Sequence, residues 1–265
     1  MMKIDCHTHV FSPEIRDAYF RQTNNYALVM QMPDSLMNND RCIETVRSDR
    51  RLFLCPSIDL KGEIPPQLER IDALPSDCRV VGLKIYLSYQ RGRADDPRLF
   101  PVYEYAEKHR LSITYHTGVC SLVLPSDQDL EGSSARYIAI AARRYPGVNF
   151  IAAHMDDPHY RQCLQIAMET ENFFTDVSGV YETGTKEGND VDGTIALFRE
   201  AMEPFPEAYT KILYGTDFCP PIMLSQLAEY DYTAEQLFKP EQLDAVYYKN
   251  ALRAFPKLKD YLTER

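Results

Sequence analysis

The sequence predicts a (β/α)₈ barrel, in which eight parallel strands alternate with helices. Eight apolar segments typical of strands are separated by helix-compatible segments along the 265 residues. Polar residues with ligand chemistry stand at the ends of several of these segments, where barrel enzymes place functional side chains. A doubly wound open sheet is the alternative, but the count of eight and the polar strand ends favour the barrel. The length suits one large domain, expected to cover residues 1–265.

The first strand begins near residue 2 and ends at a pair of histidines, His7 and His9. Ser12 and Pro13 then form the pattern of a helix N-cap followed by proline at the first helical position. Further strands are expected at residues 26–32, 52–58, 80–86, 111–118, 148–154, 173–178 and 211–217. Helices are expected before residue 51 and at 65–74, 100–110, 134–145, 160–170, 194–202 and 233–258, the last broken at Pro240.

Alternation along a strand predicts which side chains face the barrel interior. On the first strand, alternate positions put Asp5, His7 and His9 on one face, and Ile4, Cys6, Thr8 and Val10 on the other. On the fourth strand Lys84 shares a face with Gly82 and Tyr86, and on the fifth His116 shares one with Ser112 and Thr114. We therefore expect the polar residues of these strands to point inward.

Composition limits the class of partner. The net charge of −10 disfavours nucleic acid, which needs basic surface to replace counterions. No apolar stretch is long enough to span a bilayer, so no membrane partner is expected. Seven scattered cysteines without a Cys-x-x-Cys pair indicate free thiols in a reducing cytoplasm. A small-molecule substrate is the expected partner, and a homo-oligomer is compatible with the sequence.

Histidines gather at predicted strand ends. His7 and His9 end the first strand, His116 the fifth and His154 the sixth, while Asp217 ends the eighth. Four of the six histidines thus fall where scattered surface or core histidines would not be expected. Neutral imidazole is a good ligand for zinc and related metals, so two imidazoles at His-x-His spacing on a strand can reach one ion.

In several motifs the chain resembles the amidohydrolase-related metal-dependent hydrolases of the amidohydrolase superfamily. The motifs, in order, are Asp5-Cys6-His7-Thr8-His9, Gly82-Leu83-Lys84-Ile85, His116-Thr117-Gly118, residues 146–154 ending in His154, residues 174–179, residues 213–218 and Asn250-Ala251-Leu252-Arg253. Each motif is modest alone, but their order and spacing together are specific. One departure stands out: the family usually has glycine after His154, where this chain has Met155.

The resemblance implies one divalent metal ion bound by His7, His9, His116 and Asp217, with His154 beside it. Zinc is the expected ion and manganese the alternative. Asp217 would also take a proton from the attacking water, and His154 would act as general acid/base or electrostatic stabiliser. A helix N-cap is the alternative role for Asp217.

Substrate-binding candidates lie on and after the fourth strand. Lys84 is expected to bind a substrate carboxylate; the alternatives are a carbamylated lysine bridging two metals and an ion pair within the barrel. The loop residues Tyr86, Tyr89, Arg91 and Arg93 are expected to help clamp an anionic substrate, unless this loop is simply solvated.

These observations favour a metal-dependent hydrolase of a small, carboxylate-bearing molecule, with lactone or amide hydrolysis as the reaction. Decarboxylation and hydration use the same ligand set in the resembled family and stay open. A TatD-type deoxyribonuclease is disfavoured by Lys84, which stands where that group would place a glutamate, and by the acidic charge. A barrel that has lost catalysis and serves as a binding protein is a further alternative, disfavoured by the intact strand-end residues.

Overall fold

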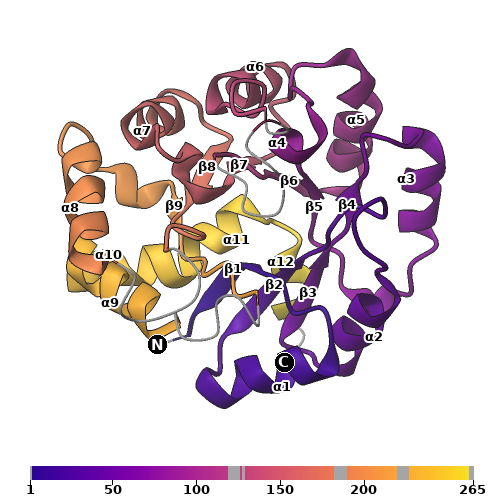
Figure 1. Cartoon of the computed structure of the whole chain (residues 1–265), viewed down its shortest axis with the longest axis horizontal. Coiled ribbons are helices and arrows are strands. Elements are labelled where there is room, and N and C mark those ends of the chain that lie inside the picture. The colour runs from indigo at the N-terminus through magenta and orange to yellow at the C-terminus, as the bar shows by residue number, and fades with distance from the viewer. Residues whose placement is uncertain (1, 119–125, 127–128, 182–189, 220–226, 263–265) are drawn as a thin grey trace.

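The computed structural model describes residues 2–118, 126, 129–181, 190–219 and 227–262. Parallel strands stand at the centre and helices surround them (Figure 1). The strands are β1 (Ile4–Thr8), β2 (Tyr26–Met30), β3 (Leu52–Cys55), β4 (Ser57–Ile58), β5 (Gly82–Ile85), β6 (Ser112–Tyr115), β7 (Phe150–Ala152), β8 (Phe173–Asp176) and β9 (Ile212–Leu213). Their positions confirm the predicted barrel strands.

Backbone hydrogen bonds at two places close the strands into a ring. β3 and β4 are halves of one predicted strand, interrupted at Pro56, which has no N–H for the ladder. Backbone bonds from Val81 N to Leu54 O (3.0 Å) and from Lys84 N to Pro56 O (2.8 Å) join both halves to β5. On the other side, Cys6 N donates to Tyr214 O at 2.9 Å, which joins β1 to the strand that contains β9.

The helices cover the outside of the barrel. They are α1 (Pro13–Gln22), α2 (Asp40–Ser48), α3 (Ile64–Asp72), α4 (Leu87–Gln90), α5 (Phe100–His109), α6 (Ala135–Arg144), α7 (Tyr160–Glu169), α8 (Val191–Met202), α9 (Leu227–Leu237), α10 (Pro240–Asp244), α11 (Asn250–Ala254) and α12 (Leu258–Leu262). The short α4 was not predicted, and the predicted break at Pro240 is confirmed as the start of α10. No helix in the described ranges is both long and apolar enough to cross a membrane.

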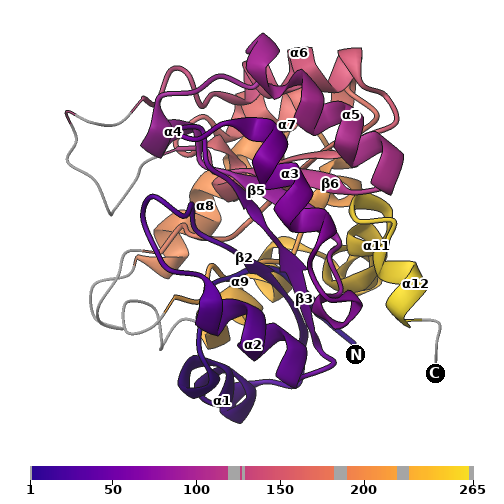
Figure 2. The same cartoon turned by 90° about the vertical axis from the view of Figure 1, so that its right-hand side faces the viewer.

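The C-terminal helices close one end of the barrel. Figure 2 shows α11 and α12 at the opposite end from α4, which directly follows the carboxyl end of β5. The Ser112 hydroxyl donates to Ala254 O, so α11 lies under the amino ends of the strands. An apolar interior cluster fills the space above it: Ile4, Cys6, Leu28, Phe53, Val81, Ile151, Phe174, Leu213 and Phe255. The opposite end, where the strands finish, is left for polar side chains.

Alternation predicted the interior correctly on β5 but not on β1. Lys84 points inward, as expected, while Leu83 and Ile85 pack in the helix-side cluster. The prediction that Asp5 shares a face with His7 is wrong. From Asp5 to Thr8 the chain of β1 advances by three residues, while its partner β2 advances by two, from Ala27 to Val29, so a bulge places one extra residue in β1. Asp5 therefore faces outward, and His7 turns inward one position after the interior residue Cys6.

Candidate active site

Three predicted ligand residues converge at the carboxyl end of the barrel. Oδ1 of Asp217 lies 2.8 Å from Nε2 of His9 and 3.5 Å from Nε2 of His7. His7 is fully buried, and Asp217 stands on a left-handed backbone with φ 53° just after β9. Although the nitrogens are close, Oδ1 has no well-angled hydrogen bond within the described chain. Three donor atoms that meet without such a bond are arranged as they would be around an ion.

In His7 and His9 the hydrogen lies on Nδ1, the ring nitrogen that faces away from Asp217. Nδ1 of His7 lies 3.1 Å from Oδ2 of Asp176, and Nδ1 of His9 lies 3.0 Å from the carbonyl oxygen of Met30. Both partners are acceptors, so each Nδ1 carries the hydrogen and each Nε2 keeps its lone pair. A carboxylate or carbonyl on the far nitrogen is the usual support of a metal-ligating histidine.

The spacing of the three donor atoms fits zinc. Zinc–nitrogen and zinc–oxygen bonds of about 2.0–2.2 Å in a tetrahedral shell place neighbouring ligand atoms roughly 3.3 Å apart. The distances of 2.8 and 3.5 Å from Asp217 bracket that value. His7, His154 and Asp176 form a second group whose donor atoms lie within 4.8 Å of one another. Because Asp176 in that group already accepts several hydrogen bonds, the group around Asp217 is the better candidate.

Burial controls the charges at this site. Burial, with the nearby charge of Lys84, lowers the pKa of His7 to about 3, so this imidazole is neutral at physiological pH. Burial alone would raise the pKa of Asp217, but the neighbouring histidines, His9 first, hold it below its usual range. A divalent cation at this site would require both imidazoles in the neutral form and the carboxylate ionised.

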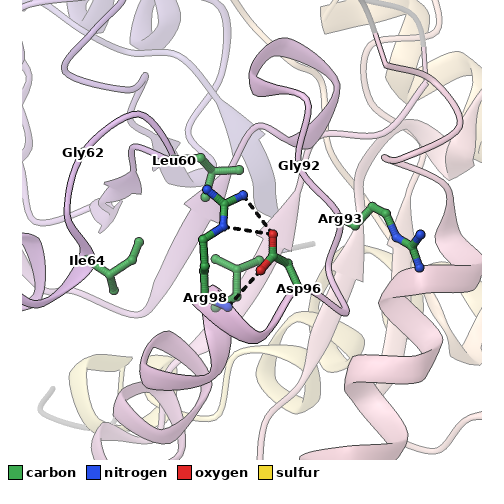
Figure 3. Close-up of a pocket in the computed structure, with 8 residues that line it drawn as sticks. Leu60, Gly62, Ile64, Gly92, Arg93, Asp96 and Arg98 are labelled. Atoms are coloured by element: carbon green, nitrogen blue, oxygen red, sulfur yellow. Dashed lines mark hydrogen bonds and ion pairs between the residues drawn. The ribbon is translucent and has the colours of Figure 1, made fainter.

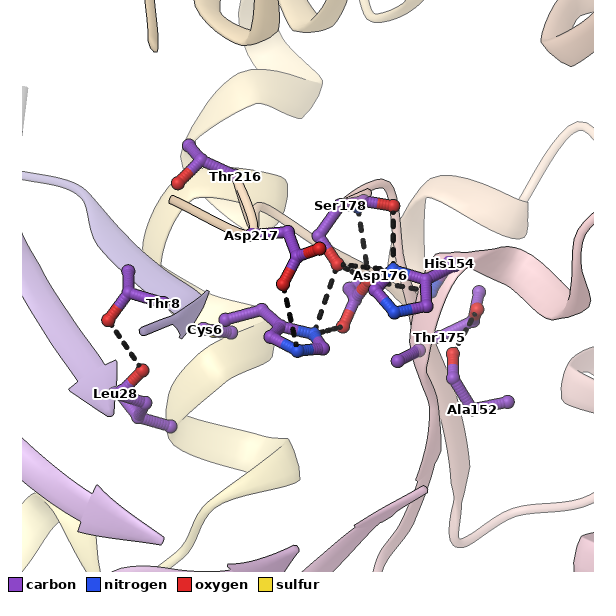
Figure 4. A network of polar contacts seen from close by, with 12 residues as sticks. Cys6, Thr8, Leu28, Ala152, His154, Thr175, Asp176, Ser178, Thr216 and Asp217 are labelled. Carbon is purple, nitrogen blue, oxygen red and sulfur yellow. Dashed lines mark hydrogen bonds and ion pairs between the residues drawn. The ribbon is translucent and has the colours of Figure 1, made fainter. Parts of the chain in front are cut away.

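His154 lies beside His7 on a strained turn. Its ring stacks on that of His7 with centroids 4.9 Å apart, and its Nδ1 lies 2.9 Å from the carbonyl oxygen of Ser178. Figure 4 shows His154, Asp176, Ser178 and Asp217 gathered at this point. His154, Met155 and Asp156 all have left-handed backbones, with φ of 58°, 49° and 55°. The position where the resembled family has glycine thus keeps a conformation that favours glycine, although Met155 occupies it.

His116 does not join the three converging residues. Its Nδ1 lies 2.7 Å from the hydroxyl oxygen of Ser88, and its ring contacts those of His154 and Tyr89. Among the residues that the structure covers, its nitrogens belong to no group of donor atoms within 4.8 Å of one another. The place of His116 in a ligand set stays a prediction.

Lys84 and Tyr86 lie inside the barrel near the histidines. Nζ of Lys84 is 3.2 Å from Nε2 of His7 and 5.0 Å from the centre of the Tyr86 ring. No carboxylate oxygen of the described chain lies within 4.0 Å of this ammonium group. Burial lowers its pKa to about 8. The hydroxyls of Tyr86 and Thr114 are buried and have no partner among the residues described. The barrel interior beside Lys84 therefore has hydroxyl groups that could donate hydrogen bonds to a bound molecule.

Arg91 and Arg93 are held by loop contacts instead. The guanidinium of Arg93 pairs with Asp95 at 2.6 Å and lies 3.9 Å over the ring of Tyr137. It borders a hollow of about 30 Å³ (Figure 3), which is too small for a substrate. Arg91 donates to the carbonyl oxygen of Ser126 at 3.0 Å. The structure does not bring either guanidinium into contact with the histidines, and their substrate roles stay predictions.

Two site residues were missed by the sequence analysis, which assigned no role to Asp176 or Ser178. Both lie in the segment of residues 174–179, which was noted only as a motif. Asp176 is fully buried at the end of β8, and His7 and other neighbours hold its pKa low despite the opposing effect of burial. An acid at the end of the seventh predicted strand follows the same positional rule as Asp217, so this position could have revealed it.

Solved structures of other proteins share the fold of this chain. A zinc-bound amidohydrolase from Burkholderia multivorans shares 13% identity, with 97% of this chain and 99% of that chain covered and a TM-score of 0.68. A probable 2-pyrone-4,6-dicarboxylic acid hydrolase from Acinetobacter baumannii, solved with citric acid, shares 15% identity over 97% and 100%, with a TM-score of 0.66. The 5-carboxyvanillate decarboxylase of Sphingomonas paucimobilis shares 12% over 96% and 99%, with a TM-score of 0.57.

At such low identity these structures show a shared fold, and they include both hydrolases and a decarboxylase. No curated protein sequence matches the chain. The family model described as amidohydrolase matches residues 4–257, nearly the whole sequence. The barrel, the strand-end histidines and this match agree, and the chain belongs to the amidohydrolase family.

Proposed function

We propose that this protein is a zinc-dependent hydrolase that opens a lactone or amide bond in a small carboxylate-bearing molecule. The observation that carries the proposal is the meeting of Nε2 of His7, Nε2 of His9 and Oδ1 of Asp217, with both Nδ1 atoms engaged elsewhere. A divalent ion held there would supply Lewis acidity and lower the pKa of a coordinated water from ~15.7 to ~7.

Two side chains handle protons in this proposal. Asp217 is ionised, because the neighbouring histidines hold its pKa low, and its carboxylate accepts the proton of the attacking water. His154 presents Nε2 to the reacting group, because Nδ1 is engaged by the Ser178 carbonyl. From there it exchanges a proton with the substrate oxygen or leaving group.

In this proposal Lys84 binds a carboxylate group of the substrate. A buried ammonium without a carboxylate partner costs stability, and a bound anion would offset that cost. The hydroxyls of Tyr86 and Thr114, which have no partner among the described residues, are further hydrogen-bond donors close to Lys84. The relative named a 2-pyrone-4,6-dicarboxylic acid hydrolase acts, by its name, on a lactone that carries carboxylates, which agrees with this substrate class.

The test is a panel of carboxylated lactones, carboxylated amides and hydroxybenzoates, assayed with zinc-loaded and chelator-treated protein. We expect zinc-dependent acid release from a lactone or amide, abolished in His7→Ala. His159→Ala, a change at an exposed histidine outside the site, serves as the matched control and keeps the activity. Release of CO₂ from hydroxybenzoates without hydrolysis would assign decarboxylation, and turnover that survives metal removal would contradict the proposal.

A further inference from the structure

The segment of residues 176–179, directly after β8, touches both catalytic histidines of the proposed function. The Asp176 carboxylate accepts from Nδ1 of His7 through Oδ2 at 3.1 Å. Through Oδ1 it accepts from the backbone N–H of His154 at 2.9 Å and from the backbone N–H of Ser178 at 3.1 Å. One buried carboxylate thus contacts a histidine of the first strand and the backbone of the turn that carries the other histidine.

Ser178 connects the same two imidazoles. Its hydroxyl oxygen lies 2.5 Å from Oδ1 of Asp176, and 3.0 Å from Nδ1 of both His7 and His154. Its carbonyl oxygen lies 2.9 Å from Nδ1 of His154. All of these atoms are buried, so the hydrogens must be distributed among them without help from bulk water.

Only one distribution of hydrogens satisfies every contact. Oδ1 of Asp176 already accepts from the backbone N–H groups of His154 and Ser178, so it acts as an acceptor and the Ser178 hydroxyl donates to it. The hydroxyl oxygen then acts as an acceptor toward both imidazoles. Consequently Nδ1 carries a hydrogen in His7 and in His154, and in the neutral form of each ring Nε2 is the nitrogen that keeps a lone pair.

Gly179 leaves the room that the His154 ring occupies. Its φ of 64° is left-handed, and a Cβ there would lie 2.3 Å from Nδ1 and 2.6 Å from Cε1 of His154. No side chain larger than hydrogen fits without moving the imidazole. The turn after β8 therefore defines both the tautomer and the place of His154.

We infer that Asp176 is a positioning residue that sets the tautomers of both His7 and His154. Ser178 contacts both imidazoles, and Gly179 leaves the room that the His154 ring needs. This inference rests on the proposed function for the use of the two Nε2 atoms, one toward a metal and one toward substrate. It predicts that metal affinity and proton transfer depend on one carboxylate that touches neither metal nor substrate.

Asp176→Asn tests the inference, since it keeps the shape of the side chain. Asn can still accept from the His154 N–H through its oxygen, but its NH₂ group then faces Nδ1 of His7. Two donors cannot face each other, so His7 should shift its hydrogen to Nε2 and lose the lone pair needed for a metal. The analogous Asp→Asn change in serine proteases costs ~10⁴ in turnover by the same tautomer effect.

The direct readout is the tautomer, measured by two-bond ¹H–¹⁵N correlation spectra of ¹⁵N-histidine-labelled, metal-free protein, with His7 assigned from His7→Ala. We expect Nδ1–H in the wild type and Nε2–H at His7 in Asp176→Asn, with zinc affinity reduced ~10–100-fold. Asp5→Asn is the matched control, because Asp5 is equally buried but its side chain accepts from Tyr19, from Thr216 and from the backbone N–H of His7, and from no imidazole. It should keep the wild-type tautomer.

An unchanged His7 tautomer and zinc affinity in folded Asp176→Asn would overturn the inference. If that variant fails to fold, the wild-type spectrum decides instead, because Nε2–H at either His7 or His154 contradicts the hydrogen distribution. A wild-type protein that binds no zinc but shows Nδ1–H at both residues, with the shift in Asp176→Asn, would refute the proposed function and leave the positioning role standing.

Discussion

Replacing Lys84 by methionine should make the metal-free protein more stable while it removes activity. Burial lowers the pKa of Lys84 from 10.5 to about 8, which means that the folded state disfavours the charged ammonium. At about 1.4 kcal/mol per pH unit of pKa change, this difference costs about 3 kcal/mol of folding free energy below pH 8. Methionine has a similar volume and no charge, so Lys84→Met should recover about 3 kcal/mol at pH 7.

The pH dependence identifies the cause. Between pH 8 and 10.5 the unfolded chain binds more protons at this lysine than the folded chain does, so the wild type gains stability as the pH rises. Lys84→Met lacks this gain, and its advantage should shrink over the same interval. Urea unfolding of chelator-treated protein at pH 7, 8, 9 and 10 measures the difference.

Lys61→Met, at an exposed lysine, is the control and should change stability little at any of these pH values. If Lys84→Met is less stable than the wild type at pH 7, or if its gain in stability does not vary with pH, burial of the ammonium group is not what lowers the stability of the wild type. Loss of turnover in Lys84→Met, despite the gain in stability, is expected because the substrate carboxylate loses its cation.

Three further predictions concern the histidines and their surroundings. His154→Ala should keep the metal but lower turnover by ~10²–10⁴, the usual contribution of a positioned acid/base, and loss of zinc in this variant would make His154 a ligand instead. Gly179→Ala should lower turnover without loss of the fold, since its Cβ would displace the His154 ring, and wild-type rates there would show that the ring position is unimportant. Zinc at 100 times its dissociation constant should raise the free energy of unfolding by about 2.7 kcal/mol, measured by thermal or urea unfolding, whereas His7→Ala should show no such gain.

The fold was largely predictable because its strands are short apolar segments with clear boundaries. The main difference, the split between β3 and β4, follows from Pro56, and the sequence shows the proline but not that the ladder breaks there. The outward position of Asp5 was not predictable from alternation. A β-bulge adds a residue to one strand of a pair, and which pair contains it depends on tertiary contacts rather than on the local pattern.

The site was predicted as far as position along a barrel strand determines it. His7, His9 and Asp217 were expected together and lie together, whereas His116 lies outside this group, with its Nδ1 against Ser88, and its role as a ligand stays a prediction. Ring orientation depends on hydrogen-bond partners distant in sequence, and strand position does not specify them. The strand-end position of Asp176 could have indicated that it belongs to the site, but its partners could not be predicted, because they lie 22 and 169 positions away in the sequence.

In the proposed function, His7, His9 and Asp217 together hold one divalent ion. Elemental analysis of the protein purified with zinc available measures this, with His9→Ala and Asp217→Ala prepared in parallel and circular dichroism to confirm that each is folded. We expect a zinc-to-protein ratio near one for the wild type and near zero for both variants. A reproducible ratio near two with carbamylated Lys84, or zinc retained when His9 or Asp217 is replaced, would contradict it.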